Sequence, residues 1–203
     1  MKEKNKRIST LELTEMAILL ALVVVLQSIS SFGVVTLCLC LVPITLGAIV
    51  LDWRCSGILG FAFGLVALFW GIVGKDVFTL YLFQANPIMT ILICVVKGSL
   101  AGILPALVFR ALKTKNHLLA SIAAAVLAPI VNTGVFALGC LIIRDDVIST
   151  AGKLGVEAVN FATLLFVVII GVNFFVELLI NAVFAPSLDK VAGIVKERLV
   201  KRI

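Results

Sequence analysis

Lys97 lies inside the apolar run PIMTILICVVKGSLAGILPALVF, residues 87–109, and is the only charged residue of that run. It follows Pro87 by ten residues and precedes Arg110 by thirteen, which is roughly 15 and 20 Å along a helix. Both distances place Lys97 near the middle of a hydrocarbon layer about 30 Å thick. Because an ammonium group there costs at least ~2.5–3.5 kcal/mol, we expect Lys97 to have a partner, a polar cavity or a function.

Other polar residues accompany Lys97 along its run. Asn86 and Thr90 precede it with i, i+4, i+11 spacing, which places all three close to one face of a helix. Gly98 and Gly102 form a small-xxx-small pair, which lets a second helix approach closely. We therefore take Asn86, Thr90 and Lys97 as candidate substrate-binding residues.

A second polar stripe lies near the C-terminus, where Asn173, Glu177 and Asn181 are spaced by four residues. Within the run over residues 118–143, Asn132 is the only polar member near the middle of the helix face that it shares with Ala125, Ala128, Phe136 and Gly139. Two interpretations stay open for this set. Lys97 and Glu177 form a buried ion pair with the asparagines bonding across helices, or these side chains line a cavity in which Lys97 meets an anionic group of a solute. We add Asn132, Asn173 and Glu177 to the candidate substrate-binding residues.

Two aromatic residues complete the candidate set. Phe78 and Tyr81 lie in the segment GKDVFTLYLFQAN, residues 74–86. They are candidates for contact with a substrate, although aromatic residues at a membrane interface more often serve as anchors. His117, the only histidine, is expected to be solvated.

The composition identifies the fold class. The 203 residues are 62% hydrophobic and 14% charged, and their mean hydropathy is +1.24. Because the apolar runs are continuous rather than alternating, the chain is expected to be an all-α membrane protein and a single domain over residues 1–203. Residues 1–10 form a basic N-terminus, residues 11–184 a six-helix bundle, and residues 187–203 an amphipathic tail at the inner surface. The six expected spans are residues 11–29, 34–51, 55–73, 87–109, 118–143 and 160–184.

The basic residues predict the orientation. With a cytoplasmic N-terminus, the outer side holds only Lys75, Arg144 and Lys153, whereas thirteen basic residues lie inside. Both termini are therefore expected in the cytoplasm, and two outer loops over residues 74–86 and 144–159 are expected to cover a site in the outer half of the bundle. The net charge of +6 is assigned to anionic membrane lipid and cytoplasmic partners, not to nucleic acid.

No catalytic set can be assembled from the sequence. The motifs HExxH, GxSxG and Walker A are absent, and no acidic cluster or CxxC pair predicts a metal site. We expect a binding protein rather than an enzyme, without a cofactor or metal ion.

Four stretches carry a resemblance to a known family: LTEMAILLALVVVL, VPITLGAIVLDWRCSGILGFAFGLV, VVKGSLAGILPALVFR and LAPIVNTGVFALG. Together with the length and the basic N-terminus, they resemble the S components of energy-coupling factor (ECF) vitamin transporters, with the folate and pantothenate group most similar.

This resemblance implies a function. The chain would be the substrate-specificity subunit of an ECF-type ABC importer in a prokaryotic plasma membrane, and would capture a water-soluble vitamin, with pantothenate or folate favoured. Ala17 and Ala21 would dock on a transmembrane scaffold subunit, and two ATPase subunits would hydrolyse ATP. The alternatives are a small autonomous facilitator or exporter, or a structural helical bundle.

Overall fold

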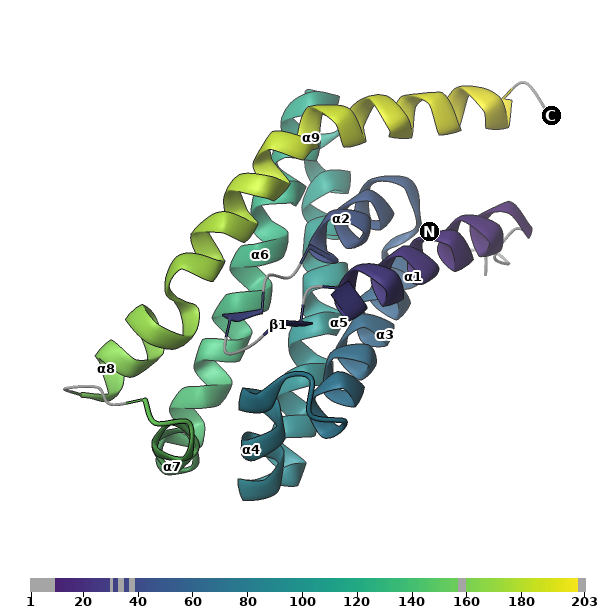
Figure 1. The fold of residues 1–203 in the computed structure, drawn as a ribbon. Coiled ribbons are helices and arrows are strands. Elements are labelled where there is room, and N and C mark those ends of the chain that lie inside the picture. The colour runs from purple at the N-terminus through teal and green to yellow at the C-terminus, as the bar shows by residue number, and fades with distance from the viewer. Residues whose placement is uncertain (1–9, 30, 33–34, 37–38, 157–159, 201–203) are drawn as a thin grey trace, which may run out of the picture.

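The computed structural model describes residues 10–29, 31–32, 35–36, 39–156 and 160–200, and within them the fold is almost entirely helical (Figure 1). The elements, in chain order, are α1 (Thr10–Ile29), β1 (Ser31–Phe32), β2 (Val35–Thr36), α2 (Leu41–Val50), α3 (Trp53–Ile72), α4 (Val77–Ala85), α5 (Pro87–Leu112), α6 (His117–Ile142), α7 (Arg144–Lys153), α8 (Phe161–Thr163), the π-helix η1 (Leu164–Ile170) and α9 (Gly171–Val200).

Five described helices are long and apolar enough to cross a membrane. They are α1, α3, α5, α6 and the part of α9 over Asn173–Val195. The first four begin and end within three residues of the predicted spans. The expectation of an all-α chain with membrane-length helices is thereby confirmed.

The predicted span over residues 34–51 is wrong in its first half. Val35 and Thr36 belong to β2, which pairs antiparallel with β1, and the helix α2 begins only at Leu41. Ten residues of helix cover roughly 15 Å, about half of the hydrocarbon layer. A short apolar run rich in β-branched residues does not distinguish strand from helix, which explains the error.

The two segments expected to be outer loops contain helices. α4 lies within residues 74–86 and α7 within residues 144–159, and the two pack against each other at one end of the bundle (Figure 1). The side-chain amide of Asn86 donates a hydrogen bond of 3.0 Å to Asp146 Oδ2 and joins the two segments. A helical cover therefore closes this end of the bundle.

The tightest helix contact joins α3 and α5. A Cβ atom built on Gly60 would overlap the backbone oxygen of Gly98, and one on Gly102 would overlap that of Ser56. Ser56 Oγ donates a hydrogen bond of 2.9 Å to the oxygen of Gly102. The expectation that Gly98 and Gly102 admit a neighbouring helix is confirmed, and that neighbour is α3.

The last expected span is divided. Residues 160–184 contain α8, the π-helix η1 and the first part of α9, and α9 continues through Pro186 to Val200. The predicted tail over residues 187–203 is thus a continuation of the same helix as far as Val200, and residues 201–203 lie outside the described residues. In Figure 1 the C-terminal part of α9 turns across the end of the bundle opposite α4 and α7.

His117 is not simply solvated, which corrects the expectation from the sequence. Its Nδ1 forms a short hydrogen bond or ion pair with Asp189 Oδ1, and Ser121 Oγ donates a hydrogen bond of 2.6 Å to the same oxygen. The imidazole also meets the Phe109 ring edge to face, with 5.2 Å between ring centroids. These contacts fasten α9 to α6, and α6 to α5, at the end of the bundle opposite α4 and α7.

Candidate functional site

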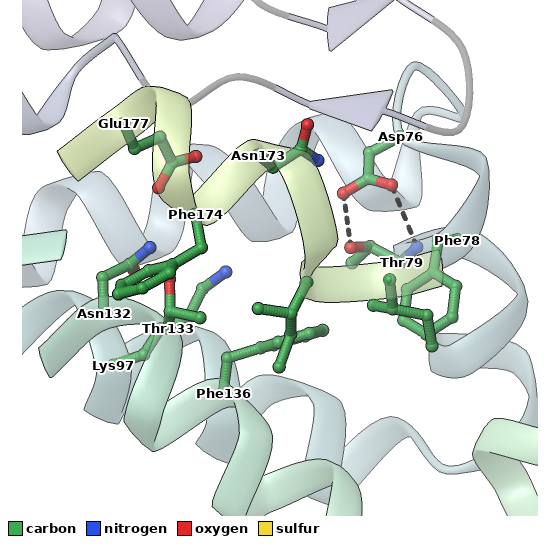
Figure 2. Close-up of a pocket in the computed structure, with 12 residues that line it drawn as sticks. Asp76, Phe78, Thr79, Lys97, Asn132, Thr133, Phe136, Asn173, Phe174 and Glu177 are labelled. Atoms are coloured by element: carbon green, nitrogen blue, oxygen red, sulfur yellow. Dashed lines mark hydrogen bonds between the residues drawn. The ribbon is translucent and has the colours of Figure 1, made fainter. Parts of the chain in front are cut away.

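A cavity lies between the N-terminal end of α4, α5, α6, η1 and α9, and Figure 2 shows its lining side chains. Its free space, open solvent at its mouth included, measures about 690 Å³. Its walls combine charged, amide, hydroxyl and aromatic side chains: Asp76, Phe78, Thr79, Lys97, Asn132, Thr133, Phe136, Ile169, Ile170, Asn173, Phe174 and Glu177.

Five of the eight substrate-binding candidates line this cavity. They come from four separate helices: Phe78 from α4, Lys97 from α5, Asn132 from α6, and Asn173 and Glu177 from α9. These positions are as many as 99 residues apart in the sequence, from Phe78 to Glu177. The fold therefore collects the polar residues of separate apolar runs around one space.

Lys97 and Glu177 contribute opposite charges to the same cavity. Lys97 Nζ lies 5.0 Å from the centroid of the Phe136 ring, within the range of a cation–π contact. Glu177 is 5% exposed, so its carboxylate is almost entirely withdrawn from solvent. Both residues lie toward the same side of the close-up (Figure 2).

Asn132 offers an acceptor that lacks a donor in the described part of the protein. The residue is 5% exposed, it lines the cavity, and its Oδ1 has no hydrogen-bond partner there. A buried acceptor without a donor costs about 1–3 kcal/mol. A ligand N–H or O–H in the cavity would satisfy this oxygen.

Asp76 is a cavity residue that the sequence reasoning missed. It caps the N-terminus of α4, because its Oδ1 accepts from the Thr79 backbone N–H at 3.2 Å and its Oδ2 from Thr79 Oγ1 at 2.6 Å. An aspartate directly before an apolar run with threonine three residues later is a helix N-cap signal, and it could have located both α4 and this carboxylate.

The remaining wall of the cavity is apolar and aromatic. Phe78 and Phe136 meet edge to face, with 6.2 Å between ring centroids. Ile169 and Ile170 come from the π-helix η1, and Phe174 from the first turn of α9. π-Helical turns occur frequently at functional sites, since the wider turn redirects side chains. These groups can hold a flat or apolar portion of a ligand.

Three other candidates lie outside the cavity lining. Asn86 caps α5 by accepting from the Met89 N–H at 3.2 Å, and Thr90 donates to the backbone oxygen of Asn86 at 2.8 Å. Lys153 Nζ lies over the Tyr81 ring, 5.8 Å from the ring centroid. Asn86, Thr90 and Tyr81 therefore have contacts within the helical cover and α5.

The docking candidates Ala17 and Ala21 lie on α1, and both are exposed. They are four residues apart and share one face of that helix. Their small side chains leave this surface accessible to another helix.

The cavity lining carries groups that can hydrogen-bond and bear charge. Across the described residues, no group of three or more His, Cys, Asp or Glu side chains could hold a metal ion. One ammonium group, two carboxylates, two amides and two hydroxyls can orient a polar solute by hydrogen bonds and charge.

Fold and site together define a helical protein with membrane-length apolar helices and a polar cavity between them. Comparisons with protein-family models, with curated proteins and with solved structures give no match to this chain.

Proposed function

We propose that this protein is the substrate-specificity subunit of an ECF-type importer, which captures a water-soluble vitamin from outside the cell. The observation that carries the proposal is the convergence of five predicted binding residues from four helices on one cavity. Lys97 supplies the charge partner for a carboxylate of the kind that pantothenate and folate carry. The resemblance of the sequence to S components supports the same assignment.

In this proposal the end of the bundle that carries α4 and α7 faces the outside. The excess of basic residues at the opposite end supports this orientation and two cytoplasmic termini in a prokaryotic plasma membrane. The strand pair and α2 together form the second of six crossings. Irregular backbone at membrane depth is tolerated where protein covers it.

Delivery of the vitamin requires partners. We assign ATP hydrolysis to two ATPase subunits and docking to a transmembrane scaffold subunit, which contacts α1 at Ala17 and Ala21. The exposure of both alanines supports this contact.

Co-purification tests the proposed assembly. The tagged full-length protein, isolated from its native host in mild detergent, should bring down a transmembrane subunit and two ATPase subunits in defined proportion. Ala17→Trp with Ala21→Trp should abolish the association. Gly134→Trp, on an exposed face of α6 that the proposal does not use, is the control.

Ligand capture is tested separately by thermal unfolding of the purified protein with individual water-soluble vitamins. A ligand at 100 times its dissociation constant should add about 2.7 kcal/mol to the apparent free energy of unfolding. Absence of both the partners and a stabilising vitamin would leave an autonomous facilitator, an exporter or a structural bundle as the remaining explanations.

A further inference from the structure

The charges around the cavity are unevenly distributed. Lys97 and Glu177 lie toward one side of the close-up, together with Asn132, whereas Asp76 lies toward the other (Figure 2). The first group brings one positive and one negative charge. The Asp76 end brings a negative charge alone.

The surroundings of Asp76 do not neutralise it. Within the described residues no lysine or arginine forms an ion pair with this carboxylate, and its only described hydrogen bonds come from Thr79. The adjacent Lys75 lies over the Trp70 ring, with its Nζ 3.8 Å from the centroid. Each carboxylate oxygen accepts one bond from Thr79 and keeps capacity for another. A cationic or N–H-bearing group of a ligand fits this position.

Hydrogen-bond capacity leads to the same conclusion at the other end. Asn132 Oδ1 is buried and lacks a donor in the described part of the chain, so it also calls for an N–H or O–H from the ligand. Among the described residues that line the cavity, Lys97 is the one with a cationic side chain, which can receive an anionic group. Phe78 and Phe136 lie along the wall and favour a flat spacer between the two polar ends.

We propose that the cavity selects a ligand with two unlike ends: an anionic group held at Lys97 and a cationic or N–H-rich group held at Asp76, joined by a flat or apolar portion. This inference deepens the proposed function and rests on the same cavity being the capture site. It excludes simple anions as the preferred ligand class, because a monoanion leaves Asn132 Oδ1 without a donor and brings no donor to the remaining acceptor capacity of Asp76.

Three small probes that share one ring separate the charge classes. Benzoate is an anion, benzylamine is a cation, and para-aminomethylbenzoate carries both groups. A fourth probe is a biphenyl that carries an aminomethyl group on one ring and a carboxylate on the other. It extends the spacing between the two charges. Binding to the purified full-length protein is measured by saturation-transfer NMR and by thermal shift at millimolar probe concentrations.

Variants that each remove one charge test which end of the ligand lies at Asp76 and which lies at Lys97. Asp76→Asn removes the charge and keeps the Oδ1 acceptor for the Thr79 backbone N–H, since asparagine caps helices as well as aspartate does. It also replaces Oδ2, the acceptor of the Thr79 hydroxyl, with an amide donor, from which that hydroxyl can accept instead. Lys97→Met keeps the length and apolar stem of the side chain. Asp145→Asn removes the same charge from an exposed position on α7, outside the cavity lining, and is the matched control.

The proposal expects a zwitterionic probe to bind about tenfold or more tightly than benzoate or benzylamine, the equivalent of one charge-assisted hydrogen bond. Asp76→Asn should reduce that preference over benzoate, Lys97→Met should reduce it over benzylamine, and Asp145→Asn should change neither. Three outcomes overturn the proposal: benzoate binds most tightly of the probes, Asp76→Asn leaves the order of probe affinities unchanged, or neither zwitterion binds. Because the assay uses the isolated subunit, its failure is distinct from a failure to recruit the scaffold and ATPases.

Discussion

Lys97 and Asn132 lie at the same depth of the bundle. Lys97 is ten residues from the start of α5 and Asn132 ten residues from the end of α6, and both helix ends face α4 and α7. Each residue is therefore roughly 15 Å from that end along its helix. The prolines of these helices, Pro105 and Pro129, fall beyond this shared segment, so a kink does not separate the two side chains.

Lys97→Met is expected to weaken binding of the captured vitamin by about tenfold or more, because one charge-assisted hydrogen bond is lost. Isothermal titration of the purified protein measures the change. Lys75→Met is the control, since Lys75 is exposed and lies over Trp70 outside the cavity lining. Unchanged affinity together with lower thermal stability would indicate that Lys97 and Glu177 form a structural pair.

Asn132→Leu should affect stability and binding in opposite directions. The substitution removes a buried acceptor without a described donor, so we expect the free energy of unfolding of the unliganded protein to stay equal or to rise by about 1 kcal/mol. The stabilisation by ligand should disappear, because the cavity loses that acceptor. Thermal unfolding with and without ligand measures both effects. A large loss of stability without ligand would mean that Asn132 has a structural partner.

Gly98→Ala is expected to destabilise the protein by about 1–3 kcal/mol, since the new methyl group would overlap the backbone oxygen of Gly60 on α3. Backbone cannot move aside as a flexible side chain does. Gly134→Ala is the matched control, because no atom lies within 4 Å of its added Cβ. Its stability should be unchanged or raised by up to about 1 kcal/mol. Equal effects of the two substitutions in thermal unfolding would contradict the close α3–α5 contact.

Hydropathy located α1, α3, α5 and α6, since twenty or more apolar residues in sequence have one stable conformation in a membrane. It did not locate the start of α2 at Leu41, because it assigned the preceding strand β2, in which Val35 and Thr36 pair with β1, to the same helix. It also missed α4 and α7 as helices, because their nine and ten residues are too short for a periodic signal.

The cavity could be predicted only in part. Helical spacing assigned Asn86 and Lys97 to one face, but they are eleven residues apart, roughly 16 Å along the axis, and only Lys97 reaches the cavity. A shared face says nothing about shared depth. Thr133 and Phe174 were missed for a related reason, since their proximity to Lys97 depends on how α5, α6 and α9 pack together.

Thr45 is expected to stabilise the helix that carries Glu177. Its hydroxyl donates a hydrogen bond of 3.2 Å to Asn181 Oδ1, and Asn181 Nδ2 donates one of 2.9 Å to the backbone oxygen of Glu177. Thr45 and Asn181 are fully buried, so Thr45→Val leaves an acceptor without its donor and should cost about 1–2 kcal/mol.

Thermal unfolding of Thr45→Val and Thr45→Ser separates the hydroxyl from the methyl group of this side chain. The serine variant keeps the donor and should retain most of the stability, whereas the valine variant keeps the shape and should lose it. Thr14→Val is the control, because Thr14 is exposed and its described hydrogen bond, to the Thr10 backbone oxygen, lies within α1. A valine variant as stable as the wild type would mean that the α2–α9 contact depends on packing alone. Because Asn181 bonds to the Glu177 backbone and not to its carboxylate, Thr45→Val should lower stability while ligand affinity changes by less than about twofold.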